Sequence, residues 1–223
     1  MACAAQEESR RRLTQTTAAH TPVAHRRFVL VSGLPASGKS TVAHAVASFL
    51  DLPVIDKDNI LERLFDEKGL GDLAWRRQLS RESDLAFQDA AAGAAVGAML
   101  TSFWHAPGMP ATSGTPLDWV FALSPLVIEL RCLCPASVAT DRFVSRTRHP
   151  GHLDSMRDPE EVRSTFEALA SLNTLGIADV VEVDTTRPVS AAAVASDLEA
   201  AFFRCRIRHA GDVGTAVGPN GVD

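Results

Sequence analysis

The chain has no excess of positive charge and few lysines. Its formal net charge is −5. This argues against broad, sequence-independent binding to nucleic acid, because such binding needs a basic surface. The basic residues are nearly all arginine, and the only lysines are Lys39, Lys57 and Lys68. We therefore do not expect nucleic acid as a partner.

Long apolar runs and paired cysteines are also missing. No stretch approaches the ~18 consecutive apolar residues of a membrane-spanning helix. The basic run at 10–12 is not followed by the apolar core of a secretory signal. The four cysteines form no C-x-x-C pair and show no zinc spacing, so a reduced compartment is the simpler inference. Cys132 and Cys134 stand two apart in a strand-like run, and we expect both to be buried on one side of it. These absences predict a cytoplasmic protein without a membrane partner.

The length of 223 residues suits one α/β domain with modest decoration. We expect residues 1–26 to form a disordered leader, because they are polar and show no periodicity. Residues 27–207 should form the domain, and the glycine-rich end, 208–223, a flexible tail. The sequence is compatible with a monomer or a homodimer.

The most informative stretch matches the phosphate-binding pattern G-x-x-x-x-G-K-[ST]. The apolar run at 28–31 before it reads as a buried parallel strand. An apolar stripe with helical spacing follows at 42–50. Strand, glycine loop and helix together direct backbone N–H groups and the helix N-terminus at phosphate oxygens. In such a loop Lys39 reaches the β and γ phosphates, and the Ser40 hydroxyl ligates Mg²⁺. The nucleotide-binding candidates here are Gly33, Leu34, Pro35, Ala36, Ser37, Gly38, Lys39, Ser40 and Thr41.

Strand-like and helical segments alternate along the rest of the chain. Strands are predicted at 52–56, 97–104, 126–133 and 178–183, after the first at 28–31. Helices are predicted at 59–66, at 74–95 with Ser80 capping its second piece, at 135–147, at 159–172 and from Ser190 to Phe203. This alternation predicts a three-layer α/β fold, with five parallel strands and helices on both faces. The ligand should then bind at the carboxyl ends of the strands, where the residues after each strand, Trp104 and His105 included, can converge.

A carboxylate pair ends the second predicted strand. Asp56 and Asp58 would lie in the crevice beside the phosphate loop. One can hold Mg²⁺ through water, while the other takes the proton of an incoming hydroxyl group. The alternative is structural, with Asp58 capping the next helix and Asp56 at a solvated strand end.

An arginine cluster follows the fourth strand. Arg142, Arg146 and Arg148 could close over the nucleotide as a lid at about 142–157 and stabilise phosphate charge, with Arg146 acting on the transferring group. Such runs are otherwise usually a solvated helix face. His149 and His152 raise the idea of a metal site, but no cysteine or carboxylate set completes it. We expect both histidines to pack within the lid.

These pieces together resemble the P-loop small-molecule kinases. The matching segments are Gly33–Thr41, 54–60, 142–152 and 184–188, within a span of about 28–203. The group includes kinases of unknown substrate related to gluconate kinase, shikimate kinase, chloramphenicol phosphotransferase and the polynucleotide kinase domain. The resemblance implies transfer of the γ-phosphate of MgATP to a hydroxyl of a small molecule. It also implies that Asp58 contacts that hydroxyl and Asp56 lies near the metal, and that Thr186 and Pro188 border the adenine.

One departure and two alternatives stay open at this point. The third strand is followed by Phe103-Trp104-His105, without the aspartate that many phosphate-loop proteins place there for Mg²⁺. Asp56 would have to take that role. The alternatives are a nucleotide-hydrolysing regulator without an acceptor and a polynucleotide 5′-hydroxyl kinase.

Overall fold

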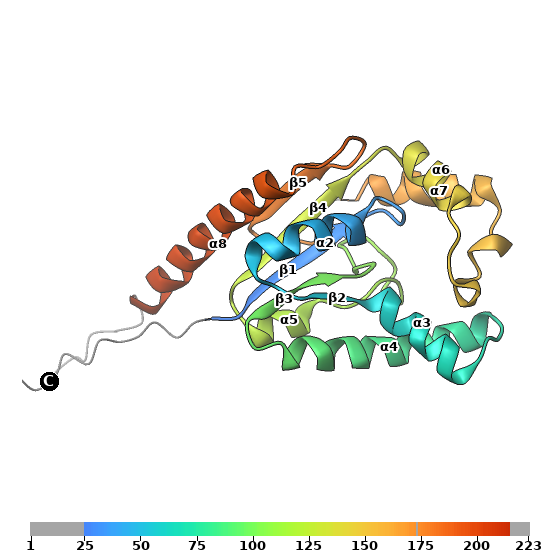
Figure 1. Cartoon of the computed structure of the whole chain (residues 1–223), viewed down its shortest axis with the longest axis horizontal. Coiled ribbons are helices and arrows are strands. Elements are labelled where there is room, and N and C mark those ends of the chain that lie inside the picture. Colours follow the sequence, from blue (N-terminus) through green and yellow to red (C-terminus); the bar gives the residue numbers. More distant parts are fainter. Residues whose placement is uncertain (1–24, 173, 215–223) are drawn as a thin grey trace, which may run out of the picture.

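The computed structural model describes residues 25–172 and 174–214, and it has the predicted α/β architecture (Figure 1). Five parallel strands form one sheet in the order β2-β3-β1-β4-β5. The strands are β1 (Arg27–Gly33), β2 (Val54–Asp56), β3 (Gly97–Thr101), β4 (Val127–Leu133) and β5 (Val180–Asp184). Because all of them run the same way, their carboxyl ends meet at one edge of the sheet.

Seven helices described here connect and follow the strands. They are α2 (Lys39–Leu50), α3 (Lys57–Lys68), α4 (Leu73–Gly93), α5 (Asp118–Leu123), α6 (Ala136–Ser145), α7 (Pro159–Ala170) and α8 (Ala191–Gly214). Short 3-10 turns at Pro150–His152 and Asp154–Met156 lie between α6 and α7. No described helix is long and apolar enough to cross a membrane.

The central strand shows why the chain forms three layers. Residues 28–31 of β1 are fully buried, and their side chains alternate between two hydrophobic clusters. Val29 and Val31 pack with α2 and α8, whereas Phe28 and Leu30 pack with residues of α3, α4 and α5. Figure 1 shows α2 and α8 over one face of the sheet and α4 and α5 over the other. The continuous apolar run is thus explained by burial on both faces.

Helices α6 and α7 form a smaller unit at the carboxyl edge of the sheet. Phe143 and Phe166 meet edge to face with ring centroids 5.5 Å apart, and Leu34 and Ala36 of the phosphate loop pack against their cluster. Asp158 caps α7, where its carboxylate accepts hydrogen bonds from two backbone N–H groups of the first turn. The unit therefore rests directly on the phosphate loop.

Several local expectations were wrong. The 74–95 segment is one continuous helix that Asp72 caps, because its carboxylate accepts from the Trp75 N–H, and Ser80 caps nothing. Helix α5 was missed, since six residues between Pro116 and Pro125 give too little periodicity to detect. Helix α8 runs past Phe203 to Gly214. Cys134 lies beyond the end of β4 and is only partly buried, unlike Cys132.

The terminal expectations mostly fall outside the described residues. Residues 1–24 of the expected leader, including Cys3, lie there, as do residues 215–223 of the expected tail. Arg26, the last leader residue, is joined to the domain by hydrogen bonds to the carbonyls of Ala92 and Leu123.

Gly97 offers a stability test, because its φ is +97° and it faces the backbone of Arg27 across the sheet. A Cβ at Gly97 would lie 2.0 Å from the Arg27 carbonyl oxygen. We expect Gly97→Ala to lower the free energy of unfolding by about 2–5 kcal/mol through backbone strain and overpacking. Urea denaturation measures this change. Gly93→Ala is the matched control, since a Cβ there has open space, and it should be neutral or stabilise by about 0.5–1 kcal/mol. Equal stability of both variants would contradict the account of Gly97.

Candidate functional site

The phosphate loop connects β1 to α2 through a narrow turn. Gly33 has φ +130°, and a Cβ there would lie 2.4 Å from the Cys132 carbonyl oxygen. Gly38 takes the N-cap position of α2 and supplies no side-chain cap, whereas aspartates cap α3, α4 and α7. The first-turn N–H groups of α2 therefore lack a side-chain acceptor from the cap. Residues 38–41 line a cavity of about 1390 Å³ at the carboxyl edge of the sheet. The geometry suits an anion.

The residues of the phosphate loop line two different cavities. Pro35, Ala36, Gly38, Lys39, Ser40 and Thr41 line this main cavity. Gly33 and Leu34 line a second pocket of about 490 Å³. Ser37 is fully buried, and its hydroxyl has no hydrogen-bond partner among the described residues.

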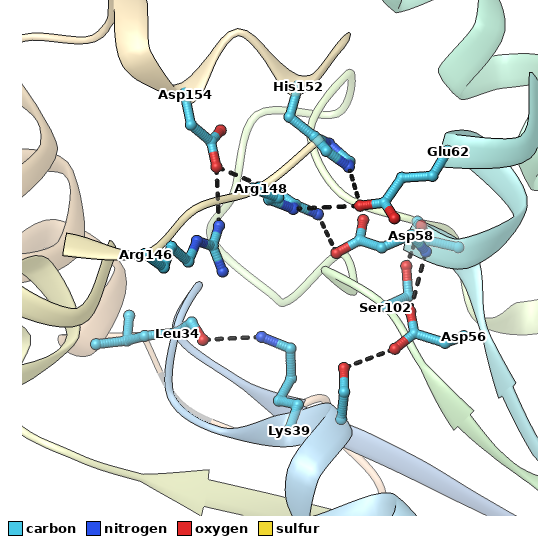
Figure 2. Close-up of polar contacts among 12 residues, drawn as sticks. Leu34, Lys39, Asp56, Asp58, Glu62, Ser102, Arg146, Arg148, His152 and Asp154 are labelled. Carbon is cyan, nitrogen blue, oxygen red and sulfur yellow. Dashed lines mark hydrogen bonds and ion pairs between the residues drawn. The ribbon is translucent and has the colours of Figure 1, made fainter. Parts of the chain in front are cut away.

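Lys39 is folded back over the loop. Its Nζ donates to the carbonyl oxygens of Leu34, at 2.8 Å, and Gly33, at 3.1 Å (Figure 2). Burial lowers the pKa of Lys39, while the charges of Asp58 and Asp56 oppose that effect. The cation thus lies at the end of β1, facing the carboxylates at the end of β2.

Ser40 and Asp56 are in direct contact. The Ser40 hydroxyl donates to Oδ2 of Asp56 at 2.6 Å, and Oδ1 of Asp56 accepts from the Asp58 N–H at 2.9 Å. Asp56 is therefore the N-cap of α3, and it is 8 % exposed. Burial raises the pKa of its carboxyl group, and the bond from Ser40 opposes this. The structural alternative is therefore wrong in detail, because Asp56 is the cap rather than a solvated strand end and Asp58 lies within the first helical turn.

Asp58 lies on the cavity wall and forms an ion pair with Arg148. The Asp58 side chain is 56 % exposed to solvent, and its partial desolvation by the surrounding groups would raise its pKa. The nearby charges of Arg148, His152 and Lys39 outweigh it, so the pKa lies below its usual value. Figure 2 shows Asp58, Lys39 and Arg146 around the same open space. The carboxylate is accordingly ionised and directed at the phosphate loop region.

In the connection between α6 and α7, residues 146–158, two arginines have acidic partners. Arg146 donates to Asp154 at 2.9 Å, and Arg148 lies 3.4 Å from the same carboxylate oxygen. Arg142 instead donates to the Thr185 carbonyl at 2.8 Å. All three predicted arginines line the main cavity, so the solvated-face interpretation is wrong.

The two histidines attach this connection to α3. His149 stacks on Phe65 with centroids 5.3 Å apart, and His152 meets the same ring edge-on at 5.5 Å. His152 also contacts Glu62 at 2.9 Å, and burial lowers the pKa of its imidazole. The described residues contain no group of three His, Cys, Asp or Glu side chains able to hold a metal. Both histidines therefore pack on an aromatic ring, but this ring belongs to α3 and lies outside the segment in which they were expected to pack.

Other predicted residues take different places. Pro188 lines the main cavity, but Thr186 lines the smaller pocket and bonds to Asp184 at 2.6 Å. Thr185, not predicted, is the neighbour that reaches the main cavity. Trp104 is buried and donates to the Val31 carbonyl, and His105 bonds to the Ser113 carbonyl. Both support the loop after β3 rather than the cavity.

Sequence reasoning gave no role to three arginines of the cavity, one of which is Arg187 after β5. Arg76 comes from α4 and Arg157 from the end of the 146–158 connection. No motif marks them, since Arg76 lies on an ordinary amphipathic helix. Lys57, which has no predicted role, forms an ion pair with Asp84 and a 3.1 Å hydrogen bond to Thr115. This contact ties α3, α4 and the loop after β3 together behind the site.

The fold was compared with those of known proteins. No family model and no curated protein sequence matches the chain. A proposed kinase from Chloroflexus aurantiacus J-10-fl has a TM-score of 0.63 at 24 % identity, over 78 % of this chain and 97 % of that one. A gluconokinase from Sinorhizobium meliloti 1021 has a TM-score of 0.48 at 16 % identity, over 83 % of this chain and 97 % of that one. A sugar kinase from Janibacter sp. HTCC2649 has a TM-score of 0.42 at 24 % identity, over 83 % of this chain and 97 % of that one. The likeness to the Chloroflexus protein shows that the chain has the α/β fold of P-loop kinases, as expected from its sequence.

The Asp58–Arg148 pair predicts a pH response. Replacing Arg148 by Gln removes the main charge that lowers the pKa of Asp58, so this pKa should rise. Titration of the side-chain carboxyl carbon by NMR measures it, with Arg63→Gln on the exposed side of α3 as control. In the wild type the lowered pKa stabilises the fold above the ordinary aspartate pKa, and this stabilisation is lost as pH falls through the folded value. Arg148→Gln should therefore lose less stability on acidification. An unchanged Asp58 titration would show that Arg148 does not set its charge.

Proposed function

We propose that the protein transfers the γ-phosphoryl group of MgATP to a hydroxyl of a small molecule. The observation that carries this proposal is the 2.6 Å contact of Ser40 with Asp56, beside Lys39 and facing Asp58 in one cavity. Phosphoryl transfer needs a phosphate cradle, a cation site, positive groups and a carboxylate for the acceptor. The residues that line the cavity include candidates for each.

The triphosphate would bind along the phosphate loop. The first-turn N–H groups of α2 would donate hydrogen bonds to its oxygens, and the positive end of that helix would attract their charge. Lys39 would exchange its two loop carbonyls for phosphate oxygens, which are stronger acceptors for a cation. Arg142, Thr185 and Pro188 would border the rest of the nucleotide, where α6 meets the residues after β5.

Ser40 and Asp56 fit a magnesium ion. Mg²⁺ prefers hard oxygen ligands, and a hydroxyl beside a carboxylate supplies them. Among the described residues, the buried Asp56 carboxyl, whose pKa is raised, has a hydroxyl and a backbone N–H as its only hydrogen-bond partners, so a cation would relieve its burial. When bound, the ion would neutralise phosphate charge. Asp56 would thus take the role of the aspartate that is missing after β3.

Asp58 would receive the acceptor hydroxyl. Its carboxylate is held ionised, so it can accept the hydrogen bond and then the proton as the oxygen attacks. Its ion pair with Arg148 lowers its basicity, and an acceptor hydroxyl would have to share or displace that arginine. Arg146, near Lys39, would then stabilise the transferring group, with the 146–158 connection acting as the lid.

The decisive variant is Asp58→Asn, which keeps the shape and removes the basicity. Acceptors are first found by measuring ADP formation from MgATP across a library of sugars, polyols, hydroxy acids and nucleosides. Transfer should then fall by about 10²–10⁴-fold in Asp58→Asn, because general-base help is lost. The calorimetric affinity for MgATP should hold, whereas Lys39→Ala should weaken it about tenfold or more. Normal transfer by Asp58→Asn would contradict the proposed role of Asp58 as the base. ATP hydrolysis unaffected by every acceptor would instead favour the regulator.

A further inference from the structure

Helix α8 has two faces of different character. Its inner face packs on β4, β5 and α2 and belongs to the hydrophobic cluster that contains Val29 and Val31. Its outer face is exposed, yet it carries two large apolar side chains, Phe203 at 64 % and Ile207 at 56 % exposure. Figure 1 shows α8 along the outer edge of the molecule, with its last turns extending beyond the strands. Large apolar side chains that lie together on an exposed face are typical of a contact surface.

The residues of this outer face follow a regular spacing. Small and apolar residues recur in alternating steps of three and four, which is the a/d spacing with which two helices pack side by side. A helix face that stays in water usually carries charged residues, but no position of this repeat does. We call these exposed residues the outer seam: Ala193, Ser196, Ala200, Phe203, Ile207 and Ala210.

Side-chain size along the outer seam favours an antiparallel partner. If a second copy of α8 packs antiparallel with its Phe203 against Ala200, then its Ile207 lies against Ser196. Each large side chain thereby meets a small one, which is how well-packed layers are filled. A parallel pair would instead place Phe203 against Phe203 and leave the small residues facing one another. The outer seam is therefore complementary to itself in the antiparallel direction.

The charges beside the outer seam favour the same direction. Asp197 and Glu199 flank it in the first half of α8, and Arg204 and Arg206 flank it in the second half; all four are exposed. An antiparallel pair places Asp197 near Arg204 of the second copy, and Glu199 near Arg206. Glu199 and Arg204 also have ion-pair partners within their own chain but stay 52 % and 55 % exposed. A parallel pair would gather the arginines of both copies at one end.

We propose that the protein forms a homodimer in which the outer seams of two α8 helices pack antiparallel. The two-fold axis would pass between Ala200 and Phe203. A two-fold contact uses the same surface of both copies, so one helix must supply both the large and the small residues and both signs of charge. The outer seam of α8 does so. The proposal is independent of the transfer reaction, because no outer-seam residue lines the main cavity.

Sedimentation velocity of the full chain over a range of concentrations tests this contact. We expect the wild type to dimerise, and Phe203→Glu to raise the dimer dissociation constant about tenfold or more, because its charge would be buried in a central layer. Ile207→Glu should act in the same way, and it keeps the test decisive if Phe203→Glu does not fold. Leu85→Glu is the matched control, since Leu85 is 65 % exposed on α4. It should dimerise like the wild type.

An exchange of charges tests the direction of packing. Arg204→Asp should weaken the dimer about tenfold, because two symmetric ion pairs with Asp197 become repulsive. Adding Asp197→Arg to that variant should restore the affinity. Asp179 keeps its ion pair with Arg208 in both variants.

Three results would overturn the proposal. The wild type could stay monomeric at every concentration up to its solubility limit. The variants Phe203→Glu and Ile207→Glu could dimerise as tightly as the wild type, which would place the contact on another surface. The double exchange of Asp197 and Arg204 could fail to restore the dimer, which would exclude the antiparallel pairing.

Discussion

The hydrogen bond between the Ser40 hydroxyl and the Asp56 carboxylate is the contact on which the candidate site depends. Ser40 follows β1 and Asp56 ends β2, and β3 lies between those strands in the sheet. Only a parallel sheet brings both residues to the same edge. Asp56 also caps α3, so this carboxylate fixes where that helix begins and hence where Asp58 lies. One side chain thereby joins the phosphate loop to the opposite wall of the cavity.

Helix α3, whose start Asp56 fixes, also positions the connection between α6 and α7. Phe65, on its last turn, packs against His149 and His152, and a Cβ at Gly151 would lie 2.3 Å from that ring. This close contact places Arg148 against Asp58. A change in the connection would therefore alter the charge around Asp58. Opening of this contact is a physical route by which binding of an acceptor could be linked to movement of a lid.

The sequence was sufficient for features that depend on local pattern and on the rules of parallel sheets. The apolar run of β1 and the glycine loop predicted the strand, the turn and α2, and alternation predicted the parallel sheet. Features set by tertiary contacts were not predictable. Nothing near Asp56 indicates that it, rather than Asp58, caps α3, because the spacing suits either residue. Arg76 is an ordinary helix residue until folding places it beside Asp58 and Arg148. The roles of Lys39, Asp58 and Arg146 remain predictions that the geometry supports.

The most direct test concerns Asp56, the residue at the centre of this account. Asp56→Asn retains an oxygen that can cap α3 but loses the charge that would hold a metal. ATP binding, followed by calorimetry over a series of free Mg²⁺ concentrations, should require about tenfold or more Mg²⁺ for half-maximal affinity in this variant. ATP binding in EDTA should stay unchanged. Asp51→Asn, at the exposed end of α2, provides the control and should keep the wild-type Mg²⁺ dependence. If Asp56→Asn shows the wild-type Mg²⁺ dependence, then Ser40 and Asp56 do not form the metal site, and the central claim is wrong.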